Sequence, residues 1–234
     1  MKSLSVVLCT YNEEKSISKT LSKLLKYKII KEIIIIDDNS QDNTIRLIRQ
    51  IKNKKVKLYV RKKIRGFASA LIKGIGKTNY NYILRFDVDM HSNIEFFIKS
   101  FLSHGDKDCI IFSRYVRGGK DLRGNFRKYS SLFLNKICNY FLSKKVKDYT
   151  SCIMIINKKI LKDISIKNTL YANFIIKFIY TIICKKIKFI EIPFVQKKNT
   201  ELNSKSAPNI KIFIKNGMLY CYTIIECLFL KLKN

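Results

Sequence analysis

Two aspartates one residue apart, Asp87 and Asp89, follow an apolar run that ends at Phe86, and His91 continues the same alternation. The chain contains 47 Lys and Arg residues but only 17 Asp and Glu residues, so closely spaced acids are unusual in it. Two like charges this close repel each other and cost stability unless a positive charge lies between them. The pair is therefore either an exposed turn, whose acids cap a helix expected to begin near Asn93, or a site that holds a cation.

In an extended segment, side chains two residues apart point to the same side, so both carboxylates and the His91 imidazole can converge. Two hard oxygen ligands near a strand end suit Mg²⁺ or Mn²⁺, which keeps several waters and takes its remaining ligands from substrate phosphates. The spacing of this DxD sequence alone favours neither the metal site nor the turn. Imidazole ligates Mn²⁺ better than Mg²⁺, so His91 is either a third ligand or a residue of the helix start.

The elements around these residues follow a regular pattern. Short Val- and Ile-rich runs alternate with longer amphipathic runs along the chain. Continuous apolar strands separated by helices are typical of a mostly parallel sheet that is covered on both faces. We expect strands at residues 4–9, 32–36, 56–60, 82–86, 109–112 and 189–195, and helices at residues 14–27, 44–52, 68–74, 127–142 and 171–184.

Polar motifs follow three of the expected strands. TYNEE comes after the first strand, DDNSQDNT after the second, and DVDMH after the fourth. In parallel α/β sheets, ligands bind at the carboxyl ends of the strands. The coincidence predicts an α/β enzyme whose site lies at this edge of the sheet.

Composition limits the class of protein. With 234 residues, 47% of them apolar, the chain can bury a large core, which excludes general disorder. The formal net charge of +30 fits three partners, namely nucleic acid, anionic lipid or phosphorylated substrates, and it also fits a general compositional bias toward lysine. Seven cysteines without a CxxC pair predict reduced thiols in a cytosolic protein, and the first apolar run is too short for a signal peptide.

Five motifs in this order, SVVLCTYNEEKSI, EIIIIDDNSQDNT, RGFASALIKGI, ILRFDVDMH and SRYVRGG, resemble those of family 2 glycosyltransferases. The later motifs RKYSSLFLN, DYTSC, EIPF and SKS make the chain most similar to the dolichol- or polyprenol-phosphate mannose synthases of that family. The resemblance implies an α/β GT-A (Rossmann-like) fold with a mostly parallel central sheet. Residues 1–206 would form the catalytic domain, and residues 207–234 a C-terminal amphipathic helix.

Carried over by motif, the resemblance implies that Tyr11 and Glu13 contact the nucleotide and that Asp38 lies near its base or ribose. Carboxylates at strand ends can accept hydrogen bonds from ribose hydroxyls and base N–H groups, which agrees with the roles implied for Glu13 and Asp38. Glu13 could equally be a first-turn acid favoured by the helix dipole, and Asp38 an ordinary turn acid. Asp87 and Asp89 match the metal site of the family, and His91 stands where Gln is common.

The basic candidates come later in the chain. Arg114 in SRYVRGG and Arg127 in FRKYSS match arginines that bind phosphate in the resembling family, and a guanidinium suits phosphate oxygens. Ser131 and Asn135 follow on the same expected helix and would help to hold the acceptor. Lys205 in SKS would lie in a loop over the site, although lysine is frequent throughout this chain.

The activity that the resemblance implies is transfer of mannose, with inversion, from the nucleotide-sugar donor GDP-mannose to a dolichyl or polyprenyl monophosphate. Asp89, Arg114 and Arg127 would be catalytic, with Mg²⁺ or Mn²⁺ as cofactor. The alternative within the family is transfer of another sugar, such as glucose from UDP-glucose, to a lipid phosphate or a glycan. The chain departs from the family at Cys9 and Cys152, where Pro and Gly are usual, and the departure near Cys152 makes the acceptor and sugar less determined than the donor site.

Apolar residues recur at helical spacing over residues 210–230. The stretch is too short to span a bilayer but suits a helix lying in the membrane interface, or a terminal helix packed on the core. We expect a cytoplasmic protein, peripheral on the cytosolic face of a membrane, held by this helix or by a membrane-anchoring subunit. A nucleic-acid-binding module is the alternative from another class, but no basic stripe with interleaved aromatics supports it, so no nucleic acid partner is expected.

Overall fold

The computed structural model describes residues 2–63, 65–162, 173–197 and 210–232, with side chains of the last helix described from residue 214 to residue 229. The chain forms two compact units. The first unit comprises Met1–Ile110 and Ile153–Leu170, and the second comprises Ile111–Cys152 and Tyr171–Asn234. Candidate residues for the nucleotide and the metal belong to the first unit, and the candidate arginines belong to the second.

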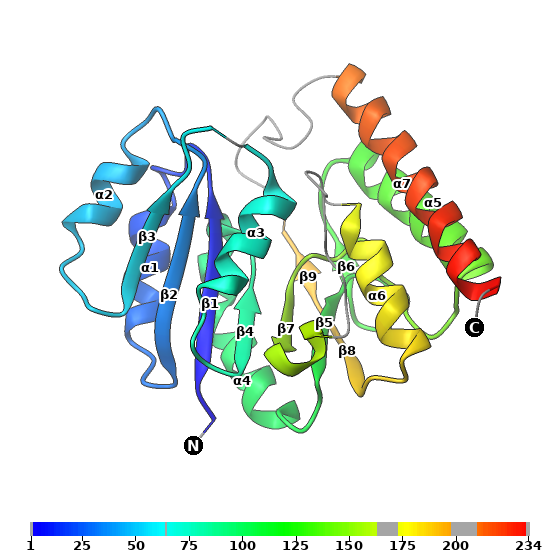
Figure 1. Cartoon of the computed structure of the whole chain (residues 1–234), viewed down its shortest axis with the longest axis horizontal. Coiled ribbons are helices and arrows are strands. Elements are labelled where there is room, and N and C mark those ends of the chain that lie inside the picture. The colour runs from blue at the N-terminus through cyan, green and yellow to red at the C-terminus, as the bar shows by residue number, and fades with distance from the viewer. Residues whose placement is uncertain (1, 64, 163–172, 198–209, 233–234) are drawn as a thin grey trace. The chain divides into compact units, whose positions relative to one another are not determined.

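The first unit is built on a mostly parallel sheet. Four parallel strands lie in the order β3-β2-β1-β4, with β1 at the centre (Figure 1). Their bounds are β1 (Leu4–Thr10), β2 (Ile30–Asp37), β3 (Val56–Val60) and β4 (Tyr82–Arg85). A further strand, β7 (Met154–Asn157), pairs with β4 in the antiparallel direction. The four parallel strands confirm the prediction made from the continuous apolar runs, whereas the antiparallel strand was not predicted.

Helices cover both faces of this sheet because the strands are apolar on both sides. Their bounds are α1 (Ile17–Leu25), α2 (Thr44–Gln50), α3 (Phe67–Gly76), η1 (Val88–Asn93), α4 (Ile94–His104) and η2 (Lys158–Lys162). Helix α3 lies over β1 and β2 (Figure 1). It approaches so closely that a Cβ added at Gly74 would stand 2.5 Å from Cγ1 of Val7. Glycine is thus required where α3 crosses the sheet.

The second unit is mainly helical. Its long helices are α5 (Asn125–Phe141), α6 (Phe174–Cys184) and α7 (Ile210–Leu232), and α7 packs against both α5 and α6 (Figure 1). Strand β5 (Cys109–Ser113), where the chain passes from the first unit to the second, neighbours β8 (Phe189–Pro193). A short parallel pair joins β6 (Lys120–Asp121) to β9 (Val195–Gln196). Helices were expected at each of the three helical positions, and the structure confirms them with shifts of a few residues.

The C-terminal helix is confirmed over Ile210–Leu232 and belongs to the second unit. Among the described residues, no helix combines the length and the apolarity needed to cross a membrane.

Candidate active site

Buried Asp37, at the end of β2, ties together the loops that follow β1 and β2. Thr10 at the end of β1 donates its hydroxyl to Asp37 at 2.6 Å, and the backbone N–H and hydroxyl of Ser40 donate to it at 2.8 and 2.7 Å. The Ser40 hydroxyl accepts the N–H of Asn12 at 2.9 Å. Asn12 and Asn39 have φ values of 53° and 60°, a left-handed conformation that asparagine tolerates. The TYNEE and DDNS motifs are therefore held next to each other at the carboxyl edge of the sheet.

Tyr11 and Glu13 leave the first of these loops at half-buried positions. The backbone N–H of Glu13 donates to Oγ1 of Thr44 at 2.7 Å, which fixes the loop against the start of α2. Arg65 donates to the Tyr11 hydroxyl at 3.3 Å, and its guanidinium carbon lies 5.0 Å from the centroid of the Tyr11 ring. The structure thus places Tyr11 and Glu13 at the predicted edge. Their contact with a nucleotide stays a prediction.

Asp38 is nearly buried, and both of its carboxylate oxygens have donors. Nε of Arg61 donates to one oxygen at 2.6 Å, and the N–H of Gly66 donates to the other at 2.9 Å. The Arg61 guanidinium also donates to the Gly66 carbonyl at 3.0 Å and to Ser69 at 2.8 Å. Gly66 has a φ of 147°, which favours glycine. Asp38 therefore holds the loop that leads into α3, and its proposed contact with the base or ribose stays a prediction.

The segment of the DxD sequence is not extended, which corrects the expectation from the sequence. Strand β4 ends at Arg85, and η1 is a 3₁₀ helix that contains both Asp89 and His91. Residues two apart in a 3₁₀ helix do not share a side, so the predicted alternation is wrong. The Thr20 hydroxyl of α1 donates to the Val88 carbonyl at 2.6 Å and anchors this helical turn on α1.

His91 lies near the basic side of α1. Burial, followed by the charges of Lys23 and Lys19, lowers the pKa of its imidazole, and Nδ1 is buried without a hydrogen-bond partner. Within the part of the chain that the structure describes, no group of three or more His, Cys, Asp or Glu side chains could hold a metal ion. The prediction of His91 as a third ligand is therefore not supported by this geometry.

The two aspartates remain compatible with a divalent cation. The Asp87 side chain is 49% exposed just beyond the carboxyl end of β4, and Asp89 follows at a half-buried position. Carboxylate oxygens are the ligands that Mg²⁺ and Mn²⁺ prefer, and Mg²⁺ sites in phosphate chemistry often take only one or two protein carboxylates. The donor set thus fits a cation whose other ligands are water and a diphosphate.

Cys9 and Arg85 lie at the same edge of the sheet. Arg85 forms an ion pair with Asp87, and its guanidinium lies 4.3 Å from the centroid of Phe67. Cys9, at the same end of β1, has its pKa raised to about 12 by burial, against the opposing charge of Arg85. The Cys9 thiol is therefore neutral near pH 7 and a poor nucleophile.

In the second unit, Arg114 is buried and fully engaged. Its Nε and Nη2 atoms donate to the two oxygens of Asp148 at 2.8 and 2.7 Å, a bidentate pair. Nη2 also donates to Thr150 at 2.6 Å, and Nη1 lies 3.5 Å from Asp121. Burial opposes the charge on Arg114, but Asp148 outweighs it and raises the pKa of the guanidinium. Arg114 thus fixes the DYTS segment, and its predicted role in binding phosphate stays a prediction.

Arg127, in the first turn of α5, has a different environment. It is half-buried and, within the described part of the chain, forms no ion pair. Burial and the nearby charge of Arg123 both lower its pKa. Arg123 itself is neutralised by Asp121, to which its Nε and Nη2 atoms donate at 2.9 and 2.6 Å. Arg127 is therefore the predicted arginine whose guanidinium has no counter-charge among the described side chains.

The two polar candidates on α5, Ser131 and Asn135, form hydrogen bonds with residues near Arg114 and Arg127. The buried Asn135 accepts the N–H of Tyr149 at 2.6 Å and donates to Thr150 at 2.9 Å, so it positions the turn that carries Asp148. The Ser131 hydroxyl accepts a hydrogen bond from Arg123 at 3.0 Å. Lys205 lies outside the described residues.

Sequence reasoning missed Arg61, Arg65, Arg123 and Asp148. Arg65 and Asp148 belong to the recognised motifs RGFASALIKGI and DYTSC, and Arg61 and Arg123 lie within four residues of a recognised motif. Their pairings could not be found from spacing, because Arg114 and Asp148 are 34 residues apart and Asp38 and Arg61 are 23 apart.

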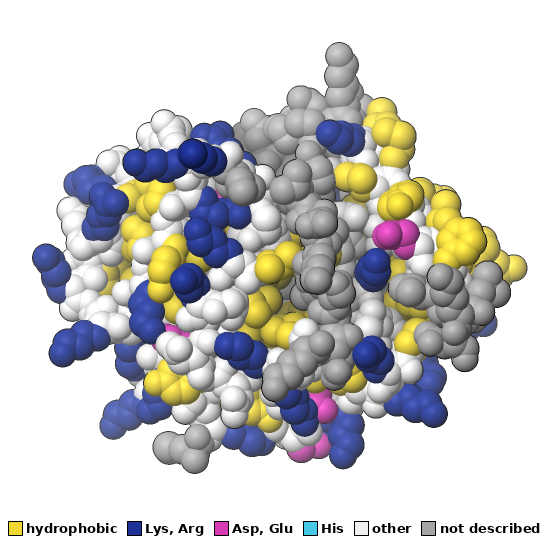
Figure 2. Space-filling model, viewed as in Figure 1, with side chains coloured by type: hydrophobic (Ala, Val, Ile, Leu, Met, Phe, Trp, Pro, Cys, Tyr) yellow, Lys and Arg dark blue, Asp and Glu magenta, His cyan; other side chains and the backbone are white. Residues whose placement is uncertain are grey.

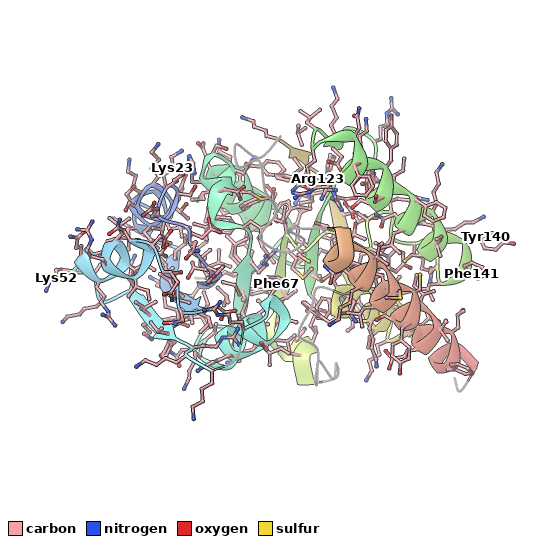
Figure 3. All side chains as sticks on the ribbon, turned by 90° about the horizontal axis from the view of Figure 1, so that it is seen from above. Lys23, Lys52, Phe67, Arg123, Tyr140 and Phe141 are labelled. Atoms are coloured by element: carbon pink, nitrogen blue, oxygen red, sulfur yellow. The ribbon has the colours of Figure 1, made fainter. Side chains whose placement is uncertain are left out.

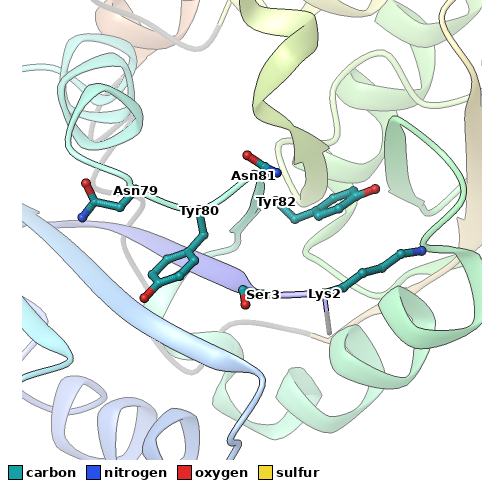
Figure 4. Close-up of a pocket in the computed structure, with 6 residues that line it drawn as sticks. All are labelled: Lys2, Ser3, Asn79, Tyr80, Asn81 and Tyr82. Carbon is teal, nitrogen blue, oxygen red and sulfur yellow. The ribbon is translucent and has the colours of Figure 1, made fainter.

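A shallow hollow of about 410 Å³ lies at the opposite, amino-terminal edge of the first sheet (Figure 4). Its lining residues are Lys2, Ser3, Asn79, Tyr80, Asn81 and Tyr82. Three of its polar side chains form hydrogen bonds elsewhere, since Lys2 and Tyr82 both donate to the Gly105 carbonyl and Asn79 donates to Glu32. This hollow is not part of the candidate site.

Residues 5–165 match the family described as Glycosyl transferase family 2, and this range is most of the chain. The chain belongs to glycosyl transferase family 2. Every candidate residue except Lys205 falls within the matched range of this family 2 member.

The curated relatives of this glycosyltransferase include poly-β-1,6-N-acetyl-D-glucosamine synthases. The protein from Staphylococcus aureus (strain COL) is 41% identical over 91 residues, which are 38% of this chain and 22% of that protein. The protein from Staphylococcus epidermidis is 27% identical over 176 residues, which are 72% of this chain and 43% of that protein. The chain thus spans less than half the length of these relatives.

Solved structures show the fold. Glucosyl-3-phosphoglycerate synthase from Mycobacterium tuberculosis in complex with UDP superposes with a TM-score of 0.73 at 12% identity, over 97% of this chain and 80% of that chain. Its complex with Mn²⁺, UDP and glucosyl-3-phosphoglycerate gives a TM-score of 0.70. The same enzyme was also crystallised with Mg²⁺ and UDP. The predicted GT-A, Rossmann-like fold with a mostly parallel sheet is confirmed.

Proposed function

We propose that this family 2 glycosyltransferase moves mannose from GDP-mannose to a dolichyl or polyprenyl monophosphate. The observation that carries the proposal is the environment of Arg127, a half-buried guanidinium near the charge of Arg123 that forms no ion pair with any carboxylate of the described residues. An anionic acceptor would supply the missing counter-charge, and a guanidinium binds a phosphate with two parallel hydrogen bonds. The sequence motifs favour a lipid monophosphate as that anion.

The donor half of the proposal rests on the first unit. Asp87 and Asp89 would hold Mg²⁺ or Mn²⁺ against the diphosphate of the donor. A cation bound there would neutralise the negative charge that develops on the departing nucleoside diphosphate. Tyr11 and Glu13 would contact the nucleotide at the loop that Asp37 ties down, while Asp38 and Arg61 keep the neighbouring loop in place.

The chemistry needs no general base. A lipid monophosphate is already ionised near pH 7, so its oxygen can attack the anomeric carbon directly. Arg127 would reduce the repulsion between the anionic acceptor and the anionic donor, and the fixed loops would orient both. A single in-line displacement predicts inversion at the anomeric carbon.

A second candidate is supported by the relatives. They are named as poly-β-1,6-N-acetyl-D-glucosamine synthases, and a solved neighbour is a glucosyl-3-phosphoglycerate synthase crystallised with UDP. Transfer of glucose or N-acetylglucosamine from a UDP-sugar, to a lipid phosphate or to a glycan, is therefore the alternative. The difference between these sugars depends on a few contacts in the donor site.

The proposed acceptor also implies a place of action. We infer that the protein works in the cytoplasm, peripherally on the cytosolic face of a membrane, held there by its own helices or by an anchoring subunit. No nucleic acid partner is proposed.

The test is a donor screen on the purified full chain. GDP-mannose, UDP-glucose and UDP-N-acetylglucosamine are each supplied with Mg²⁺ or Mn²⁺ and a short, water-soluble prenyl phosphate, and the sugar on the product is identified. The expected product is prenyl-phosphate mannose. A product from a UDP-sugar alone would select the alternative, and transfer only to a glycan primer would refute the lipid-phosphate acceptor.

Two substitutions test whether Asp89 and Arg127 take part in sugar transfer. Asp89→Asn is expected to lower the transfer rate on the order of 10²-fold, because a cation ligand is lost where charge develops. Arg127→Gln is expected to raise the KM for the prenyl phosphate more than the KM for the donor. Asp106→Asn, at an exposed position on the first unit, is the matched control and is expected to behave as the unmodified chain. A folded Asp89→Asn protein with normal activity would refute the metal assignment.

A further inference from the structure

Two neighbouring helices of the second unit carry stripes of large exposed apolar side chains. Those of α5 are Phe126, Tyr129, Phe133 and Tyr140, and those of α7 are Ile214, Met218, Tyr222, Ile225 and Phe229. Their spacings of three, four or seven residues place each set along one side of its helix. We call these nine residues the α5–α7 face. In Figure 2, hydrophobic side chains gather along the position of α7, and in Figure 3 Tyr140 projects outward from the end of α5.

Neither stripe is needed to pack the second unit. Helix α5 buries Asn135 and Cys138 on its other side, and α7 buries Ile224 and Cys227 on the side opposite its stripe. Phe133 is 66% exposed, although a side chain of that size normally finds a buried position. Among the described residues, each helix therefore buries one side within the unit and exposes a second, apolar side.

Exposed apolar side chains are concentrated in this unit. In the first unit, the large hydrophobic residues with comparable exposure among the described ones are Phe96 and Leu102. Clustered patches, unlike scattered single residues, mark interaction sites. The kind of partner is then decided by what surrounds the patch.

Cations outnumber carboxylates in the unit that carries the α5–α7 face, where the partly exposed acid on α7 is Glu226. Described carboxylates of the second unit are all buried or held by donors. Asp121 and Asp148 are buried against arginines, Glu191 accepts two backbone N–H groups, and Glu226 pairs with Lys177 at 3.7 Å. Exposed cations of the same unit include Arg117, Lys120, Lys136, Lys144, Lys145, Lys147, Lys185, Lys186, Lys188 and Lys215. An aromatic and aliphatic surface among such cations is complementary to an anionic lipid surface.

We propose that the α5–α7 face lies in the interface of an anionic bilayer, so that α5 and α7 together make the membrane contact. Phenylalanine, isoleucine and methionine would enter the acyl boundary, tyrosine hydroxyls would remain at the headgroups, and lysines would meet the lipid phosphates. The inference rests on the proposed function in one respect. Arg127 lies on α5, one of the two helices of this face, so a bilayer there would hold a lipid-phosphate acceptor next to the helix that carries the proposed acceptor arginine.

The chain contains no tryptophan, which allows a direct test. Phe133→Trp places a single fluorescent reporter in the α5–α7 face, and Leu102→Trp places one at an equally exposed helical position of the first unit. Each full-length variant is mixed with vesicles of phosphatidylcholine alone or with about one third phosphatidylglycerol. With anionic vesicles, the indole emission of the Phe133→Trp variant is expected to shift to the blue and its quenching by acrylamide to fall several-fold. The emission and quenching of the Leu102→Trp variant are expected to stay unchanged.

Flotation of the same vesicles gives a second measurement. Phe133→Ser combined with Phe229→Ser is expected to lower the fraction bound to anionic vesicles roughly tenfold, and Leu102→Ser is expected to leave it unchanged. Equal effects at Leu102 and at the face, or equal binding to neutral vesicles, would each overturn the proposal. So would a blue shift of the Phe133→Trp variant on raising the protein concentration without vesicles, which would identify a second copy of the chain as the occupant.

These vesicles contain no nucleotide-sugar and no prenyl phosphate, so their outcome is independent of the transferase chemistry. Conversely, the soluble prenyl phosphate reports transfer without a membrane. A double serine variant that keeps soluble transfer but loses vesicle binding is the expected pattern. Normal vesicle binding by a chain without transferase activity would refute the proposed function and leave the membrane face standing.

Discussion

At the scale of single residues, Arg114 and Arg127 have different partners and therefore different roles. Arg114 is buried with Asp148 at 2.7 Å and positions the DYTS turn, whereas Arg127 has no ion pair among the described residues. A guanidinium already bound to a carboxylate must give up that partner before it can hold a phosphate. Arg127 can accept an anion without such an exchange, which makes it the better candidate for the acceptor.

Removing Asp148 is expected to destabilise the chain strongly. Asp148→Ala leaves Arg114 buried with Asp121 at 3.5 Å as its remaining carboxylate, and breaking a buried pair in this way costs about 3–5 kcal/mol. Urea denaturation measures the change in the free energy of unfolding. Asp106→Ala, whose ion pair with Lys107 is exposed, is the control and is expected to leave the free energy of unfolding nearly unchanged. Equal effects of the two substitutions would contradict the positioning role of the Arg114–Asp148 pair.

Residue types could be predicted from the sequence better than their partners. The DxD aspartates and both arginines stand in recognisable motifs, but a motif does not show which side chain lies across from it. The predicted convergence of His91 with Asp87 and Asp89 failed because the backbone after β4 turns into a 3₁₀ helix. Hydrogen bonding of that turn to α1, far away in the sequence, decides its conformation.

At the scale of elements, the short strand β6 and the start of α5 are joined by ionised side chains. Burial opposes the ionisation of Asp121, but hydrogen bonds and charge from Arg123, with the charge of Arg114, outweigh it and lower the pKa of Asp121 from 3.8 to about 2. A carboxyl whose pKa is lowered by folding adds stability above its unfolded pKa. That contribution is lost as the pH falls from near 4 to about 2.

We therefore expect Asp121→Asn to be less stable than the unmodified chain near neutral pH, with a gap that closes as the pH falls from about 4 to about 2. Denaturant unfolding at a series of pH values measures the gap. Other carboxylates titrate in both proteins, so their effects cancel in the difference. A gap that is constant with pH would show that Asp121 acts by shape rather than by charge.

Helix α3 offers a matched pair of glycines. Gly74→Ala would place a methyl group 2.5 Å from Val7 Cγ1, and overpacking of this kind costs about 1–3 kcal/mol. Gly76→Ala meets no atom within 4 Å at the end of the same helix and is expected to be neutral or to stabilise by up to about 1 kcal/mol. Thermal unfolding of both variants measures the difference. Equal melting temperatures would contradict the close approach of α3 to β1.

Elements were predictable where hydrophobic periodicity alone determines them. The Ile-rich run of β2 and the amphipathic run of α1 are read directly from the sequence, and their positions shift by only a few residues. Strand β7 and its antiparallel pairing with β4 were not predicted, because the direction of the strand depends on the path of the intervening 68 residues, 86–153. The two-residue strand β6 carries too short a pattern to be recognised.

At the scale of the whole molecule, the net charge of +30 acts on stability as well as on binding. Like charges repel more in the compact state than in the unfolded chain, so screening them should favour folding. Salt weakens exposed ion pairs most, and the exposed pairs among the described residues, such as Lys99 with Glu95, contribute little to stability. Repulsion among the excess cations is therefore expected to outweigh the attraction within the exposed ion pairs.

We expect the melting temperature to rise as KCl is increased from about 0.02 M to about 0.2 M and then to level off, because the Debye length falls below about 8 Å in that range. Differential scanning calorimetry measures the rise. A variant with several exposed lysines of the second unit changed to glutamine, such as Lys144→Gln, Lys145→Gln and Lys147→Gln, should show a smaller rise. A melting temperature that falls with KCl would mean that ion pairs, rather than the excess of cations, dominate the electrostatic free energy of this fold.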